Sequence, residues 1–163
     1  MLHFALTMDR QQIIDRLLDH YERPRHHGPL EGADVMMPGG IPDCGDTVMI
    51  YLKVDAGGER VEALSFEGQG CTISQAAASL LAEELPGKGL DAVLAMDDAD
   101  VIDLLGREVA RARPRCATLA LHTIQTAVIA YRKKQGNGAL GTEDRGSASE
   151  RPNPLPGRSP PND

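Results

Sequence analysis

The sequence lacks tryptophan, and aromatic residues make up only 3% of its 163 positions. It also lacks any apolar run of about 18 residues, the length that a membrane-spanning helix needs. Residues 1–9 have neither the basic segment nor the small-residue cleavage site of a secretory signal. These absences predict a cytoplasmic protein that neither crosses nor enters a membrane.

Positive charge is scarce. Lys and Arg number 17 against 24 Asp and Glu, which gives a formal net charge of -7. Such a balance repels nucleic-acid phosphates and anionic lipid unless a local basic patch overrides it. The composition therefore argues against a general nucleic-acid binder and against a membrane-surface protein.

Cysteine is rare and unpaired. Cys44, Cys71 and Cys116 are an odd number at wide spacing, without a Cys-x-x-Cys pair. An odd number of cysteines cannot all pair, and a reducing cytoplasm keeps thiols free, so a disulfide framework is disfavoured. Another explanation for the three thiols is needed.

Apolar residues are also scarce at the C-terminal end. Residues 136–163 contain 16 Gly, Pro, Ser or Asn and four apolar residues, too few to repay the entropy of ordering the segment. We therefore predict one domain over residues 1–135 and a disordered Gly/Pro/Ser-rich tail over residues 136–163.

Hydrophobic periodicity predicts an α+β domain. Helical spacing over residues 9–21 indicates a first helix, and alternation over residues 48–54 indicates a strand. Further elements are a short strand at 33–37, a return strand at 60–66 with a bulge or burial on both faces, a helix from about 71 to 85, a helix-poor link at 90–96, a helix at 99–105 and a final helix opened by Pro114. Strands followed by helices predict a small antiparallel sheet covered by helices on one face.

The three cysteines and one aspartate occupy element ends. Cys44 and Asp46 share the strand face that carries Val48 and Ile50, which should meet the helices. Cys71 and Cys116 stand at helix starts, where the helix dipole lowers thiol pKa, so two activated thiols are predicted. If these ends converge, the four side chains supply one tetrahedral set for Zn(II) or an iron–sulfur unit.

A plainer interpretation exists for each residue. Isolated cysteines often act only as small buried apolar side chains, and an aspartate such as Asp46 is often a turn or cap residue. Arg111, Arg113 and Arg115 add positive charge beside Cys116, which favours its thiolate and suits an acidic partner, or they form only a solvated basic rim. No histidine is assigned as a ligand, and the glycine-rich segments do not match a phosphate-binding loop.

Several segments together resemble a known family. They are Pro24-Arg25 with Gly28 and Leu30, Cys44-Gly45-Asp46 opening a strand, Phe66-Glu67-Gly68-Gln69-Gly70-Cys71-Thr72-Ile73-Ser74, and Cys116-Ala117-Thr118-Leu119 opening a helix. In this order, from about Ile13 to Lys134, the chain is similar to iron–sulfur cluster assembly proteins of the IscU, SufU and NifU N-terminal type. The three cysteine segments are jointly specific.

The resemblance implies a SufE/NifU-like fold, with a three-stranded antiparallel sheet and a site at one end. Carried over, the metal- and cofactor-binding residues are Cys44, Asp46, Cys71 and Cys116. The family binds zinc or assembles a [2Fe–2S] cluster there, and it receives persulfide sulfur from a cysteine desulfurase of the SufS or IscS type. Cys116 is then the candidate sulfur acceptor.

Within the family, the chain resembles the SufU type. Arg115 precedes the last cysteine where IscU-type members have histidine, and the Leu-Pro-Pro-Val-Lys chaperone motif is not found. The extra segment typical of SufU between the second and third cysteines is, however, absent, because the stretch from Gly106 to Arg115 is short.

The resemblance thus implies an iron–sulfur scaffold or zinc-dependent sulfur acceptor that passes sulfur or cluster to downstream acceptor proteins, rather than a stand-alone enzyme. An aspartate in place of a fourth thiolate suits transfer, because a hard oxygen ligand of a soft site exchanges more readily. The alternative is a small structural zinc protein that binds a partner and performs no sulfur chemistry.

Overall fold

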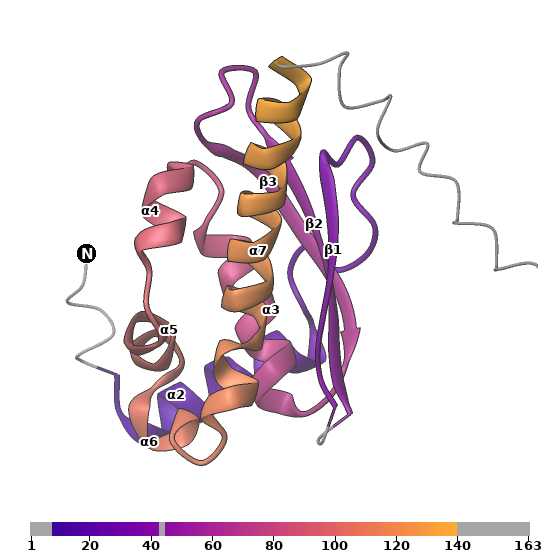
Figure 1. The fold of residues 1–163 in the computed structure, drawn as a ribbon. Coiled ribbons are helices and arrows are strands. Elements are labelled where there is room, and N and C mark those ends of the chain that lie inside the picture. The colour runs from indigo at the N-terminus through magenta and orange to yellow at the C-terminus, as the bar shows by residue number, and fades with distance from the viewer. Residues whose placement is uncertain (1–7, 43–44, 140–163) are drawn as a thin grey trace, which may run out of the picture. The chain divides into compact units, whose positions relative to one another are not determined.

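The structure is a computed structural model, and it describes residues 8–42 and 45–139 (Figure 1). The chain divides into two units, residues 1–131 and 132–163. The first unit contains the sheet, the core and all the site residues considered below. Within the part of the chain that the structure describes, none of the helices has the length and apolar character that a membrane span requires.

Three antiparallel strands form one sheet in the order β1-β2-β3. They are β1 (Val35–Ile41), β2 (Asp46–Val54) and β3 (Val61–Gln69). The predicted irregularity in the return strand is a register shift opposite Lys53 and Val54, and β3 is buried on both faces at residues 64–66. The α+β class with a small antiparallel sheet is confirmed.

Strand β1 extends beyond the predicted residues 33–37, through Pro38 and two glycines to Ile41. Phe66 of β3 directs its backbone N–H and C=O away from β2, toward residues 26–28. Its partner Ile50 therefore directs its own N–H and C=O toward β1. The hydrogen-bonding direction alternates along β1, so the nitrogen of Pro38 faces away from β2. Proline is tolerated on an edge strand where its missing N–H faces away from the ladder. The Pro38-Gly39-Gly40 stretch is therefore compatible with a strand.

Six helices follow or precede the sheet. They are α2 (Arg10–Glu22), α3 (Thr72–Glu84), α4 (Leu90–Ala95), α5 (Asp98–Leu105), α6 (Arg107–Ala110) and α7 (Pro114–Ala139), counted over the described residues. Asp9 and Gln12 close a capping box at the start of α2, and Asp97 and Asp100 do the same for α5.

Two boundary predictions need correction. The sequence predicts a helix-poor link at residues 90–96, but Leu90–Ala95 forms α4, because Leu90 and Val93 are three apart and both are completely buried. The last helix continues past Gln135 to Ala139, through glycines that were assigned to the tail. Residues 140–163 lie outside the described residues, so the disordered tail stays a prediction.

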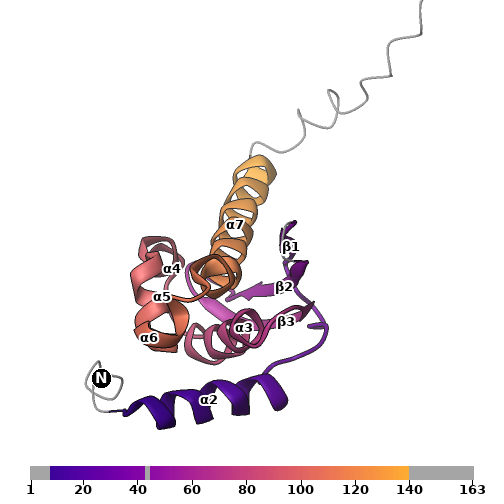
Figure 2. The same cartoon turned by 90° about the horizontal axis from the view of Figure 1, so that it is seen from below.

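The core lies between one face of the sheet and the helices. Alternate residues of β2 are buried from Asp46 to Val54, and they meet apolar side chains of α3 and α7. Figure 2 shows α3 to α7 gathered on one side of the sheet, as the sequence predicts, while α2 packs against α3. A Cβ on Gly39 would lie 2.0 Å from Thr123 Oγ1, so glycine is required where β1 meets α7.

A buried polar cluster connects α2 to α3. His20 Nδ1 lies 2.7 Å from Ser79 Oγ, which also accepts the backbone N–H of Arg25 at 2.8 Å. His20 Nε2 lies 4.0 Å from Glu83. Burial and the nearby charge of Arg25 lower the pKa of His20, against the opposing effect of Glu83. His20 is therefore held neutral in the folded protein at neutral pH.

This cluster gives a prediction for pH-dependent stability. Below pH 6.5, the ordinary pKa of histidine, the unfolded chain binds a proton at His20 before the folded chain does. The free energy of unfolding should therefore fall as the pH is lowered from 6.5 toward the folded-state pKa. Urea unfolding at pH 7.5 and 5.5 measures this change, and His20→Gln should flatten it. Equal pH dependence in both proteins would contradict the assignment.

Candidate metal centre

Asp46 is placed by the alternation of β2. It is the first residue of the strand and shares the buried face with Val48 and Ile50. Only 3% of its surface is exposed. A carboxylate this deeply buried requires hydrogen-bond or metal partners, because an isolated buried charge is costly. The predicted orientation of Asp46 is confirmed.

Cys71 is the N-cap residue of α3 and is partly exposed. Its extended backbone ends the turn after β3, and its carbonyl accepts the N–H of Gln75 at 3.2 Å. The thiol makes no cap hydrogen bond to the helix. Its side chain is therefore free to point toward the neighbouring β2.

Cys116 lies in the first turn of α7, two residues after Pro114. Pro114 suits a helix start, since its fixed φ fits the helix and its missing N–H is not needed there. Cys116 is buried, with 2% of its surface exposed. Both predicted helix-start positions are therefore correct.

The three side chains converge. One ligand atom each of Asp46, Cys71 and Cys116 lies within 4.8 Å of the others. Cys71 donates its backbone N–H to Asp46 Oδ1 at 3.1 Å and its thiol to Asp46 Oδ2 at 3.5 Å. Cys44, the fourth predicted ligand, lies outside the described residues, so its place in the site stays a prediction.

The donor set fits Zn(II). A sulfur at about 2.3 Å and an oxygen at about 2.1 Å from a tetrahedral zinc lie about 3.6 Å apart. The separation of Cys71 Sγ and Asp46 Oδ2, 3.5 Å, matches this spacing. Two thiols and a carboxylate on rigid elements are also ligands that zinc and iron–sulfur units accept. The arrangement is therefore a candidate metal site.

The electrostatics of the metal-free site differ from the sequence prediction. Burial and hydrogen bonding to Asp46 and Cys71 raise the pKa of Cys116 to about 12. The predicted activation of this thiol is thus wrong for the metal-free chain, because burial beside a carboxylate outweighs the helix dipole. A bound cation reverses this balance, since a coordinating thiol is deprotonated outright.

The pKa of Asp46 shifts in the opposite direction. Burial raises its pKa, but hydrogen bonds from Cys116, Cys71 and Ser74 more than offset this, so its pKa is lowered. Asp46 is therefore an anion at neutral pH. The metal-free site holds one negative charge and at least one neutral thiol beside it.

One depression adjoins Cys71, and a second borders Arg115, the residue before Cys116. The first, of about 360 Å³, is lined by Tyr21, Gly70, Cys71, Thr72, Ile73 and Arg113. It reaches the exposed side of Cys71 and has exposed Arg113 at its rim, whereas Cys116 lies deeper. An approaching molecule therefore meets Cys71 first, and the basic rim predicted near Cys116 also borders Cys71.

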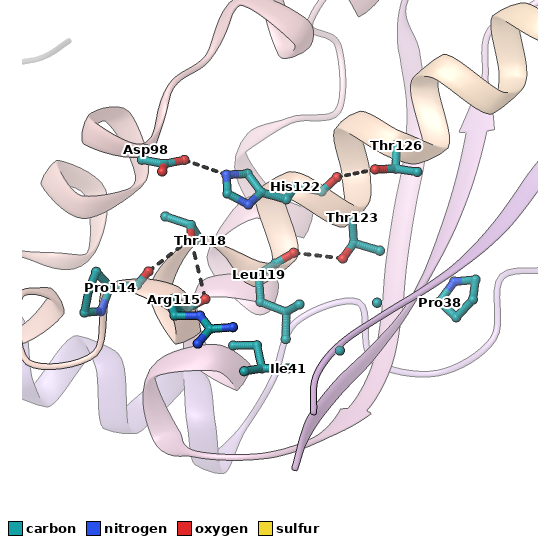
Figure 3. Close-up of a pocket in the computed structure, with 12 residues that line it drawn as sticks. Pro38, Ile41, Asp98, Pro114, Arg115, Thr118, Leu119, His122, Thr123 and Thr126 are labelled. Carbon is teal, nitrogen blue, oxygen red and sulfur yellow. Dashed lines mark hydrogen bonds and ion pairs between the residues drawn. The ribbon is translucent and has the colours of Figure 1, made fainter. Parts of the chain in front are cut away.

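The other depression is a groove of about 470 Å³ between β1 and the first half of α7 (Figure 3). Arg115 and Ile41 lie at one end of it, and His122 lies 2.6 Å from Asp98 of α5. The hydroxyls of Thr118, Thr123 and Thr126 donate to carbonyls of α7 itself. The groove thus has few polar groups left to bind a ligand.

Sequence reasoning missed Ser74. It is buried beside Cys71 and Asp46, and its hydroxyl donates to the Cys71 carbonyl at 3.1 Å. The signal in the sequence is a serine three residues after the predicted helix start at Cys71, a position typical of capping interactions.

Known proteins are similar to this chain in sequence. The family model described as "NifU-like N terminal domain" matches residues 12–138. "Iron-sulfur cluster assembly scaffold protein IscU" of Haemophilus influenzae is 33% identical over 125 residues, which cover 75% of this chain and 97% of that protein. "Zinc-dependent sulfurtransferase SufU" of Bacillus subtilis is 33% identical over 139 residues, covering 75% of this chain and 90% of that protein.

A solved structure supports the fold. The N-terminal NifU-like protein from Brucella abortus superposes with a TM-score of 0.63 and 22% sequence identity, over 75% of this chain and 99% of that chain. At this identity the likeness concerns the fold alone. The three-stranded sheet with helices on one face is therefore an arrangement that this chain shares with NifU-like proteins.

Proposed function

The chain belongs to the NifU-like N-terminal domain family, and on that premise we propose that it receives persulfide sulfur from a cysteine desulfurase and passes sulfur or a [2Fe–2S] cluster onward. The observation that carries this proposal is the convergence of Asp46, Cys71 and Cys116. Two relatives, one named as a scaffold and one as a zinc-dependent sulfurtransferase, are similar over most of their length.

In this proposal Asp46, Cys71 and Cys116 hold Zn(II) together with Cys44, two residues before Asp46. Zinc, when bound, keeps the ligating thiols as thiolates at neutral pH. The chain places Asp46 on β2, Cys71 at the start of α3 and Cys116 in α7, so regular elements set the spacing of these three residues. A [2Fe–2S] cluster at the same residues is cargo to be built and released.

Cys116 is the proposed sulfur acceptor. Its thiolate attacks the outer sulfur of a partner's cysteine persulfide, a new S–S bond forms, and the bond inside the donor persulfide breaks. The partner's cysteine leaves as a thiolate, and Cys116 carries the persulfide, so no external oxidant or reductant is needed. Before it loses its proton, the Cys116 thiol hydrogen-bonds Asp46, and this contact positions the sulfur.

The partner surface surrounds the exposed side of Cys71. Arg111 and Arg113 are exposed on the segment that leads into α7, and Arg113 borders the depression at Cys71. Positive rim charges speed association with a negatively charged partner surface more than they strengthen it. An acidic patch around the desulfurase active site is the complementary feature.

One experiment separates this proposal from a purely structural zinc protein. Purified chain, loaded with one zinc per chain, is incubated anaerobically with desulfurase and cysteine, and sulfur is located by mass spectrometry. Persulfide on the chain supports sulfur transfer, and visible absorption after added iron supports the scaffold role. Tightly held zinc with neither sulfur nor cluster would support the structural alternative and overturn the proposal.

A further inference from the structure

Ser74 is buried beside the candidate metal site. It is the third residue of α3, and 3% of its surface is exposed. Its hydroxyl lies 3.1 Å from the Cys71 carbonyl and 3.8 Å from the Cys71 thiol. The hydroxyl has one hydrogen, which can turn from the Cys71 carbonyl to Asp46, and this interaction lowers the pKa of Asp46. One small side chain thus contacts two of the three converging residues.

Gly70 shows how closely these groups meet. Its φ is +156°, and a Cβ built there would lie 2.6 Å from Asp46 Oδ1 and 2.7 Å from Ser74 Oγ. Any side chain at this position would intrude between the carboxylate and the hydroxyl. The missing Cβ therefore leaves the space in which Asp46 and Ser74 come together.

The two oxygens of Asp46 consequently have different surroundings. Oδ1 accepts the backbone N–H of Cys71 at 3.1 Å and lies on the Ser74 side. Oδ2 faces the Cys71 thiol at 3.5 Å. One oxygen is attached to the start of α3, and the other is turned toward sulfur.

We propose that Ser74 is a positioning residue of the metal site: with the Cys71 N–H it anchors Oδ1 of Asp46, so that Oδ2 alone is presented to a metal. This inference rests on the proposed metal site and deepens it. Groups that hydrogen-bond a metal ligand commonly change metal affinity by about 10- to 100-fold when they are removed.

The test is a double-mutant cycle on zinc affinity. Competition with a chromophoric chelator gives the zinc dissociation constant for wild type, Ser74→Ala, Asp46→Ala and the double variant. Ser74→Ala should raise the constant about 10-fold in the wild-type background. It should raise it little in the Asp46→Ala background, because Ser74 acts through Asp46. Equal effects in both backgrounds would overturn the inference.

Two further variants guard against a folding artefact. Ser74→Thr keeps the hydroxyl and should restore zinc affinity toward wild type. Ser79→Ala removes another buried hydroxyl of α3, one that bonds Arg25 and His20 and not the site, so it should lower melting temperature without changing zinc affinity. An equal change in zinc affinity for Ser74→Ala and Ser79→Ala would show general loosening of α3 and count against Ser74.

Cobalt substitution supplies a spectroscopic readout. The visible Co(II) bands report the ligand set, so Ser74→Ala should shift them and Ser74→Thr should return them toward wild type. An unshifted spectrum with unchanged affinity overturns the role of Ser74 alone. Wild-type protein that binds neither zinc nor cobalt would instead overturn the proposed metal site itself.

Discussion

Cys116→Ser is expected to abolish persulfide loading and to weaken zinc binding by roughly 100-fold or more. Loss of a group that only hydrogen-bonds a metal ligand already lowers metal affinity by up to about 100-fold, and Cys116 is a proposed ligand itself. A serine hydroxyl neither accepts sulfane sulfur nor serves as a soft ligand at neutral pH. The loss should be seen as absent sulfur in mass spectra after incubation with desulfurase and cysteine.

The folded state should tolerate this change. Cys116 is buried and hydrogen-bonded to Asp46, and a serine hydroxyl can donate the same bond from the same position. The metal-free variant should therefore stay within about 1 kcal/mol of wild type in free energy of unfolding, the size of one ordinary hydrogen bond. Thermal melting without metal checks this, so a lost activity cannot be ascribed to unfolding.

Cys71→Ser is the matched control. Cys71 is also a converging thiol, so its replacement should weaken zinc binding as well. At saturating zinc, Cys71→Ser should still accept sulfur, whereas Cys116→Ser should not. The depression beside Cys71 makes this comparison necessary, because Cys71 is the more exposed of the two. Sulfur found on Cys71 of the wild-type protein would refute the acceptor assignment.

The elements that carry the site could be predicted from the sequence because each has a local signal. Alternation over residues 48–54 fixes which face of β2 is buried, and that places Asp46. Pro114 and the Gly70-Cys71 turn mark the starts of α7 and α3. The antiparallel connection of neighbouring strands then limits how far apart these ends can lie.

Other features could not be predicted because they depend on contacts between distant segments. The raised pKa of Cys116 reflects its burial and a carboxylate seventy positions away in sequence, and neither is visible to reasoning from the local helix dipole. The close approach at Gly70 involves Asp46 of another element. Helix α4 has six residues, too few to be stable alone, so it forms because Leu90 and Val93 are buried in the core.

Asp46→Ala should lower the rate of sulfur transfer at least tenfold while leaving about one zinc bound at stoichiometric concentrations. Thiolate sites bind zinc tightly enough that losing one oxygen ligand weakens affinity without emptying the site. Transfer suffers more, because the variant lacks both the exchangeable oxygen ligand and the group that orients the Cys116 thiol.

The lowered pKa of Asp46 determines how the stability of the Asp46→Ala variant, relative to wild type, depends on pH. A carboxyl whose folded-state pKa lies below its ordinary 3.8 stabilises the fold above that pH and loses this contribution as the pH falls through the folded value. At pH 7 the metal-free Asp46→Ala variant should therefore be less stable, by about 1 kcal/mol for the partly buried Cys71 N–H that loses its acceptor. Near pH 2 the difference between the variant and wild type should shrink.

Transfer rate and melting temperature measured on the same Asp46→Ala protein decide between a ligand and a structural turn residue. A turn or cap residue contributes to stability through the backbone alone, so its loss would lower the melting temperature and leave transfer unchanged. A ligand role predicts slowed transfer even after the lost stability is compensated by a lower assay temperature. Because Asp46 faces two thiols from two other elements, we expect the second outcome, and wild-type transfer in a destabilised variant would remove Asp46 from the site.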